Sequence, residues 1–282
     1  MGGGMAANLL GKGWDVQVCD IDPAKTAAMT QMGAVGIAFP ADAPVDSLAF
    51  IICVVDAAQT EDVLFGGQGL ARMLRPGHTV MLCPTIAPQD VEDFTRRLAE
   101  LGVQTLDAPM SGGPARARDG SMSLMLACSQ DAYEQQAGLL KALSSKVFRV
   151  GEKPGDGART KLVNNLLAGI NLVGAAEAMA LAGRLGLDLA TTLDVIEQSS
   201  GQSWIGSDRM RRAIAGDYAP RAHVTLLEKD TRLAVEAARA AGFEGPLGLR
   251  ASQVFADAHQ AGLAGEDDAA LFKHLKHLAG KP

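Results

Sequence analysis

The first half of the chain alternates between two patterns of hydrophobic positions. From Trp14 to about Val150, short apolar runs are separated by segments with helical periodicity. The runs read DVQVC, LAFIICVV, HTVMLC, VQTLDAP, SMSLMLAC and KVFRVG, and the helical segments include residues 23–32, 88–101 and 131–143. This alternation is typical of βαβ units that build a mostly parallel sheet.

The second half contains no further strand pattern. Helical periodicity covers residues 161–183, 191–198, 207–215, 226–241 and 246–261. A chain of 282 residues is long enough for about two domains. We therefore predict an α/β domain with a doubly wound sheet at residues 1–152, and an all-helical domain at residues 153–282 that begins with a long helix. The glycines between residues 151 and 157 mark the boundary.

Charge and cysteine usage exclude several classes of function. A net charge of -6 and a pI near 5.4 provide no basic face for nucleic acid or an anionic membrane. The cysteines lack metal-ligand spacing and close apolar runs, so we predict reduced core residues and no metal site: Cys19, Cys53, Cys83 and Cys128. The N-terminus has no basic region followed by an apolar stretch, so we expect a cytoplasmic protein.

The segment of residues 166–183 is apolar enough to raise the question of a membrane span. Asn171 and Glu177 interrupt it, and alanine and glycine dominate it. We expect a buried helix that does not cross a membrane. Its small residues could pack between subunits, so we also expect a homo-oligomer.

The N-terminal sequence MGGGMAANLL is a glycine-rich helix start, and the strand after it ends at Asp20. In a dinucleotide-binding fold, such glycines let the backbone approach a pyrophosphate, and an acidic residue after the second strand binds the ribose hydroxyls. Glycine-rich helix starts also occur without a ligand. These residues alone leave both interpretations open.

The motif DAPMSGG places Ser111, Gly112 and Gly113 directly after a strand. A hydroxyl followed by two glycines can direct O–H and N–H groups at a carboxylate. The alternative is a structural tight turn.

The segment GDGARTKLVNN places Lys161 and Asn165 four residues apart, on one face of the long helix. A desolvated lysine near a cationic nicotinamide has its ammonium form disfavoured and can accept a hydroxyl proton, which an amide can orient. The alternative is a solvated surface lysine. Further along, Lys229 and Asp230 lie in an otherwise apolar helix, where the simplest interpretation is a surface ion pair.

These motifs, in this order and together with CPTIAP at residues 83–88, resemble the β-hydroxyacid dehydrogenases over essentially the whole chain. The resemblance implies a Rossmann domain joined by a long helix to a helical domain. It also implies NAD(P)-dependent oxidation of a small hydroxy acid. A non-catalytic dinucleotide-binding protein is the alternative from another class, and Lys161 argues against both that and imine reduction.

Site roles follow from the resemblance position by position. Lys161 corresponds to the catalytic lysine and Asn165 to its supporting amide, while Ser111, Gly112 and Gly113 form the turn that binds the substrate carboxylate. The resemblance places cofactor contacts at Thr85 and Lys229, and the dinucleotide-binding interpretation of the N-terminal segment adds Met1, Gly2 and Asp20. Asp20 would repel a 2′-phosphate, so NAD is favoured over NADP.

The stretches at residues 201–210, 216–224 and 265–273 are similar to family members that oxidise four-carbon sugar acids such as L-threonate. The neighbouring alternatives are 3-hydroxyisobutyrate oxidation and tartronate semialdehyde reduction. Ala222, His223 and residues 225–228 depart from the apolar run that relatives carry before the Lys229–Asp230 pair, so the substrate's tail could differ.

The largest departure from the family lies at the N-terminus. Relatives carry an apolar first strand and two further glycines ahead of the positions that are Met1 and Gly2 here. That strand is central in a doubly wound sheet and its loop contacts the pyrophosphate. With this first strand missing, we expect lower stability and weaker cofactor binding. A misassigned start site or a trimmed chain explains the departure most simply.

Overall fold

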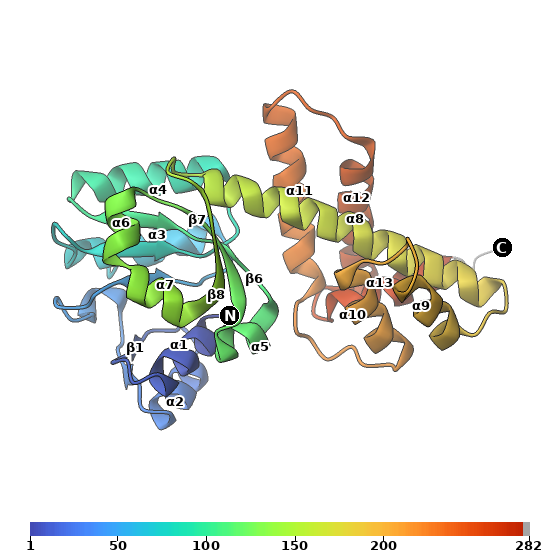
Figure 1. Cartoon of the computed structure of the whole chain (residues 1–282), viewed down its shortest axis with the longest axis horizontal. Helices are drawn as coiled ribbons and strands as arrows, with labels where there is room; N and C mark the ends of the chain where they lie inside the picture. The colour runs from blue at the N-terminus through green and yellow to red at the C-terminus, as the bar shows by residue number, and fades with distance from the viewer. Residues whose placement is uncertain (279–282) are drawn as a thin grey trace. The chain divides into compact units, whose positions relative to one another are not determined.

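The computed structural model describes residues 1–278, and the chain forms two compact units. Unit 1 comprises Met1–Lys161, and unit 2 begins at Leu162. Figure 1 shows a mixed α/β architecture in the first and helices in the second. The predicted fold class, with its parallel-dominated sheet and helical C-terminal part, is confirmed.

Unit 1 contains one larger sheet, in the order β3-β4-β5-β7-β6 with β8 also paired to β7. Its strands are β3 (Phe50–Ile52), β4 (Thr79–Leu82), β5 (Gln104–Asp107), β6 (Met110–Ser111), β7 (Met122–Ala127) and β8 (Ser144–Gly151). β3, β4 and β5 are parallel, whereas β7 is antiparallel to both β5 and β6. β6 escapes the sequence pattern because two residues show no periodicity.

Helices cover both faces of this sheet. They are α1 (Gly2–Gly11), α3 (Ala57–Phe65), α4 (Pro88–Glu100), α5 (Gly113–Asp119), α6 (Gln130–Gln135) and α7 (Ala137–Leu143), whereas α2 (Pro23–Gln31) packs against α1. Along β4, Met81 packs into the cluster that includes α1, α5 and α7, while Val80 and Leu82 pack into the cluster that includes α3 and α4. A strand buried on both faces explains the continuous apolar run in the sequence.

β1 (Gln17–Val18) and β2 (Val35–Gly36) form a separate parallel pair. Among the described residues, no ladder of hydrogen bonds joins this pair to β3. In the doubly wound strand order, the first strand that the resemblance implies would lie between β1 and β3. The break in the sheet is therefore at the place of that strand.

Unit 2 is helical, and α8 (Asp156–Arg184) leads into it from unit 1. The other helices are α9 (Leu189–Glu197), α10 (Trp204–Ile214), α11 (Val224–Ala240), α12 (Pro246–Ala258) and α13 (Leu271–Leu278). Phe255 lies fully buried in their common core. α8 and α11 approach closely at Gly169, where any Cβ would lie 2.5 Å from Cγ2 of Thr231.

The helix predicted at residues 131–143 is two helices that meet at Gln136. The Gln136 amide donates to Oγ1 of Thr79 and to the carbonyl of Leu48, contacts that local periodicity does not reveal. The long helix begins earlier than predicted, at Asp156. α3, α5 and α13 are additional to the predicted helices.

The prediction that all cysteines are core residues is wrong at Cys19. Cys83 and Cys128 are buried and Cys53 is half-buried, but Cys19 is exposed because it lies beyond the end of β1, which closes at Val18. Burial raises the pKa of the Cys128 thiol to about 11.

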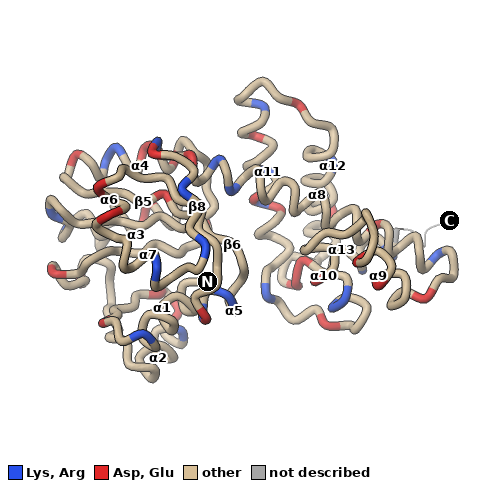
Figure 2. Tube along the Cα trace, viewed as in Figure 1, with Lys and Arg blue, Asp and Glu red and all other residues tan. Residues whose placement is uncertain are grey.

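α8 is long and apolar enough to cross a membrane by length and composition alone, a test that core helices of soluble proteins also pass. Within its most apolar window 39% of the residues are buried. Basic and acidic residues are interspersed along the elements of each unit (Figure 2).

Candidate active site

The carboxyl ends of the parallel strands in unit 1 carry two of the residues singled out from the sequence and one further acid. Asp20 follows β1, Thr85 follows β4, and Asp107 ends β5. Because the carboxyl ends of parallel strands are where open α/β sheets bind ligands, this edge is the candidate cofactor site.

The first turn of α1 is shaped for close approach. A Cβ at Gly2 would lie 3.0 Å from Cβ of Cys53, and one at Gly4 would lie 2.9 Å from the carbonyl oxygen of Pro114, so both glycines pack against neighbouring elements. Gly3 is exposed, and a Cβ there would meet no atom within 4 Å. The first turn of a helix leaves backbone N–H groups without partners inside the helix, so a helix that begins at Gly2, with open space at Gly3, fits a pyrophosphate.

Asp20 is accessible for a ribose. Its side chain is 39% exposed, accepts a hydrogen bond of 2.9 Å from the backbone N–H of Asp22, and lies 3.8 Å from Nζ of Lys25. One carboxylate oxygen is thereby oriented by the backbone, and the group remains open to a ligand. Thr85 is half-buried in the segment between β4 and α4.

Ser111, Gly112 and Gly113 form the turn between β6 and α5. Gly112 and Gly113 have φ values of +129° and +76°, in the region that favours glycine, and a Cβ at Gly112 would lie 2.8 Å from Cδ of Arg116. All three turn residues are half-buried, and Ser111 is held by its pairing with Ser123 of β7. The glycines are required by the backbone, so this geometry accommodates both a carboxylate-binding turn and a structural one.

Lys161 lies in the second turn of α8 and is only 8% exposed. A lysine is rarely so buried unless it is paired or has a role, which argues against the solvated surface residue considered above. Asn165 follows one helical turn later and is also buried.

In unit 2, Asn165 belongs to a short chain of polar groups. Its Nδ2 donates to Oδ2 of Asp230 at 2.6 Å, and Nζ of Lys229 donates to Oδ1 of the same carboxylate at 2.7 Å. The side chains of Lys229 and Asp230 are 17% and 10% exposed. This is a largely buried ion pair and not the surface pair that the sequence suggested, and it orients the Asn165 amide.

The structure divides the candidate residues between the units. Unit 1 contains Met1, Gly2, Asp20, Thr85, Ser111, Gly112, Gly113 and Lys161, and unit 2 contains Asn165 and Lys229. Sequence analysis missed Asp230 as the partner of Asn165, and it gave Asp107 no role. Both acids lie within sequence motifs named above. The partner of Asp230 is 65 residues away in the sequence, and the partners of Asp107 are about 50 residues away.

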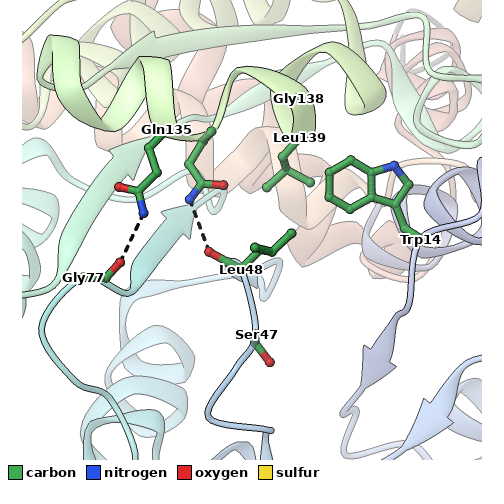
Figure 3. A pocket seen from close by; sticks show the side chains of 8 residues that line it. Trp14, Ser47, Leu48, Gly77, Gln135, Gly138 and Leu139 are labelled. Carbon is green, nitrogen blue, oxygen red and sulfur yellow. Dashed lines mark hydrogen bonds between the residues drawn. The ribbon is translucent and has the colours of Figure 1, made fainter.

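A cavity of about 340 Å³ in unit 1 lies at the other edge of the sheet (Figure 3). Its lining includes Trp14 ahead of β1, Leu48 ahead of β3 and Gly77 ahead of β4. In Figure 3 the Gln135 side chain points to the Gly77 carbonyl, to which it donates at 3.3 Å. Because these residues precede their strands, the cavity is remote in the fold from the cofactor edge.

Among residues 1–278, no cluster of three or more His, Cys, Asp or Glu side chains is arranged to hold a metal ion.

Known proteins resemble the chain along nearly its whole length. The profile of the NAD binding domain of 6-phosphogluconate dehydrogenase matches residues 1–151, and that of the NAD-binding domain of NADP-dependent 3-hydroxyisobutyrate dehydrogenase matches residues 155–275. L-Threonate dehydrogenase of Cupriavidus necator is 41% identical over 97% of this chain and 92% of its own length. The enzyme of that name from Escherichia coli K12 is 38% identical over 97% and 91%.

The fold has a similarly close counterpart. The crystal structure of 3-hydroxyisobutyrate dehydrogenase from Salmonella typhimurium superimposes with a TM-score of 0.91 at 37% identity, and the match covers 97% of this chain and 95% of that one. The matches establish a nicotinamide dinucleotide as the cofactor class. The chain is therefore an oxidoreductase and belongs to the 3-hydroxyisobutyrate dehydrogenase-like family of β-hydroxyacid dehydrogenases.

Proposed function

We propose that this protein oxidises L-threonate, or a similar four-carbon sugar acid, to the keto acid with NAD. The observation that carries the proposal is the set of relatives named L-threonate dehydrogenase, at 38–41% identity over 97% of the chain. A relative named 3-hydroxyisobutyrate dehydrogenase is 34% identical and one named 2-hydroxy-3-oxopropionate reductase is 29% identical. These two activities are the alternatives.

Lys161 acts as the acid/base group in this proposal. When bound, a nicotinamide dinucleotide would supply the acceptor for the hydride that leaves the carbon carrying the hydroxyl. The hydroxyl proton passes to Nζ of Lys161, so that the substrate loses one hydride and one proton and becomes a ketone. The burial of Lys161 supports this role because it limits competition from water.

Asn165 orients the reacting hydroxyl. Its Nδ2 carries two N–H groups, and one of them is committed to Asp230. Asp230 is in turn held by Lys229, so the amide has a fixed direction in unit 2. In the proposal, the second N–H donates to the substrate.

The panel that tests the substrate contains C3 and C4 hydroxy acids, assayed with NAD and with NADP. L-Threonate should give the highest kcat/KM, with 3-hydroxyisobutyrate and the reduction of tartronate semialdehyde measured alongside. A higher kcat/KM for either of those two would replace the proposed substrate by that one.

Ser111→Ala should raise the KM for the hydroxy acid and leave the KM for NAD unchanged. The Ser111 hydroxyl is assigned to the substrate carboxylate, and a hydrogen bond to a charged group contributes about 1.5–3 kcal/mol, or roughly a 10- to 150-fold change in affinity. Steady-state kinetics with each substrate varied in turn provide the measurement. An unchanged KM for every acid would show that the turn is structural only.

Asp20→Ala should narrow the preference for NAD over NADP. The carboxylate accepts from the ribose hydroxyls and repels an added phosphate, and its exposure leaves it available for both effects. The ratio of kcat/KM for the two cofactors is the measurement, with Asp15→Ala, an exposed acid at the amino end of the same strand, as the control. A wild-type enzyme that prefers NADP would overturn the assignment.

A homo-oligomer is the proposed assembly. The exposed apolar side chains of α8 recur near helical spacing, and they are Val163, Leu167, Leu181 and Leu185, the last directly after the helix. Such a stripe is commonly covered by another subunit. Sedimentation velocity tests this, and a monomer at micromolar concentration would contradict it.

A further inference from the structure

The side chain of Asp107 is the least exposed acidic group at the carboxyl edge of the sheet and is bound by the start of α8. It is 1% exposed. Its Oδ2 accepts the backbone N–H groups of Gly155 at 3.0 Å, Gly157 at 2.9 Å and Ala158 at 3.2 Å. Three N–H groups that have no partner within a helix are thereby satisfied by one carboxylate from a strand about 50 residues earlier.

The chain is shaped so that this contact can form. A Cβ at Gly157 would lie 2.7 Å from both the carbonyl oxygen and Oδ1 of Asp107, so no other residue fits there without displacement. Gly155 has a φ of +89°, which favours glycine. Gly157 is thus explained by its close approach to Asp107, and Gly155 by its backbone conformation.

The contact connects two segments that have roles in the proposed reaction. Asp107 ends β5, and Ser111 follows it four residues later in β6. Lys161 follows Gly157 by four residues, which is about one helical turn. A shift of the first turn of α8 relative to β5 would therefore move Nζ of Lys161.

We propose that Asp107 is a positioning residue whose buried carboxylate fixes the first turn of α8, and with it Lys161, against the end of β5. The effect on turnover rests on the proposed function, because it requires Lys161 to be the acid/base. The anchoring of the helix by Asp107 does not depend on that function.

The charge of Asp107 contributes to the anchoring. The partial positive charge at a helix N-terminus favours a carboxylate, and hydrogen bonds to an ionised acceptor are the stronger ones. Burial nevertheless raises the pKa of Asp107 to about 6, against the three N–H bonds, which lower it. The charge therefore disappears as the pH falls through about 6, and the first turn should then be held less firmly.

Acidic groups and thiols face Asp107. Asp156 of α8 raises its pKa further. The thiols of Cys83 and Cys128 face it from the ends of β4 and β7, and each has a raised pKa to which Asp107 contributes. Glu152 lines the same cavity of about 230 Å³ as Asp107.

The test compares Asp107→Asn with Asp131→Asn, an exposed acid on α6 outside the site. Asp107→Asn keeps the size of the side chain and removes its charge. We expect kcat to fall on the order of tenfold to a hundredfold, as for a misplaced catalytic group, while the KM for NAD stays within about twofold. The wild type should lose kcat below about pH 6, and this acidic limb should be absent in Asp107→Asn.

Hydrogen exchange at Gly157 and Ala158 separates the two parts of the proposal. Faster exchange in Asp107→Asn is expected, and unchanged exchange would overturn the anchoring even if Lys161 were not catalytic. Faster exchange with wild-type kcat would overturn the positioning role. If Asp107→Asn does not fold, Gly157→Ala provides the same test with the carboxylate intact, and wild-type kcat and exchange in that variant would overturn the proposal.

Discussion

Lys161→Ala is expected to lower kcat by at least about a hundredfold while the Kd for NAD stays within about twofold. General acid/base groups contribute on the order of a hundredfold or more to rate, and they act on a proton that moves in the transition state. Lys161 is buried on α8, and Asn165 lies one turn further along the same helix. The loss should therefore appear in kcat for every hydroxy acid that the enzyme accepts.

The matched control is Lys153→Ala. Lys153 is an exposed lysine in the segment just before α8, so its removal changes the net charge equally without touching the helix. Its kcat should equal that of the wild type. Near-normal turnover in Lys161→Ala, with the fold intact by circular dichroism, would exclude Lys161 as the acid/base group.

Local pattern was sufficient for the elements that are buried on both faces or are strongly periodic. Val80, Met81 and Leu82 of β4 are all apolar because helices cover both sides of the strand, and α4 and α11 have clear helical spacing. β2 and β6 were missed because each has two residues and exists only through its partner strand. The break at Gln136 was missed because its cause is a contact with Thr79.

The candidate site likewise has features that the sequence predicts and contacts that it does not. The spacing of Lys161 and Asn165 is a property of one helix, so the sequence alone predicts that they share a face. The partner of Asn165 is Asp230, on a helix that approaches α8 only in the folded unit. The contact of Asp107 with the start of α8 likewise joins segments about 50 residues apart. No local pattern contains such contacts, although the glycines that permit them are visible in the sequence.

A gap separates β1 from β3, and the open edge of each of these two strands faces the gap. Val16 and Val18 bond to β2, so the backbone N–H and C=O of Gln17 point the other way. Ile52 bonds to β4, so the backbone groups of Ile51 point away from β4. Trp14 and Val16 on one side and Ala49 and Ile51 on the other are only partly buried, and the cavity of Figure 3 lies where the two lead-in segments separate.

A strand added ahead of Met1 should therefore stabilise the protein and strengthen NAD binding. An apolar parallel strand of about six residues followed by a glycine turn would pair with both open edges and bury side chains under helices on both faces. We expect the Tm to rise on the order of 5–10 °C, which corresponds to a few kcal/mol for a domain of this size, and the Kd for NAD to fall. The control is an extension of equal length with Asp at alternate positions, which cannot be buried without a large desolvation cost. If the 282-residue chain is monodisperse and binds NAD as tightly as the extended one, the strand is dispensable and the glycine-rich start of α1 is sufficient for the cofactor.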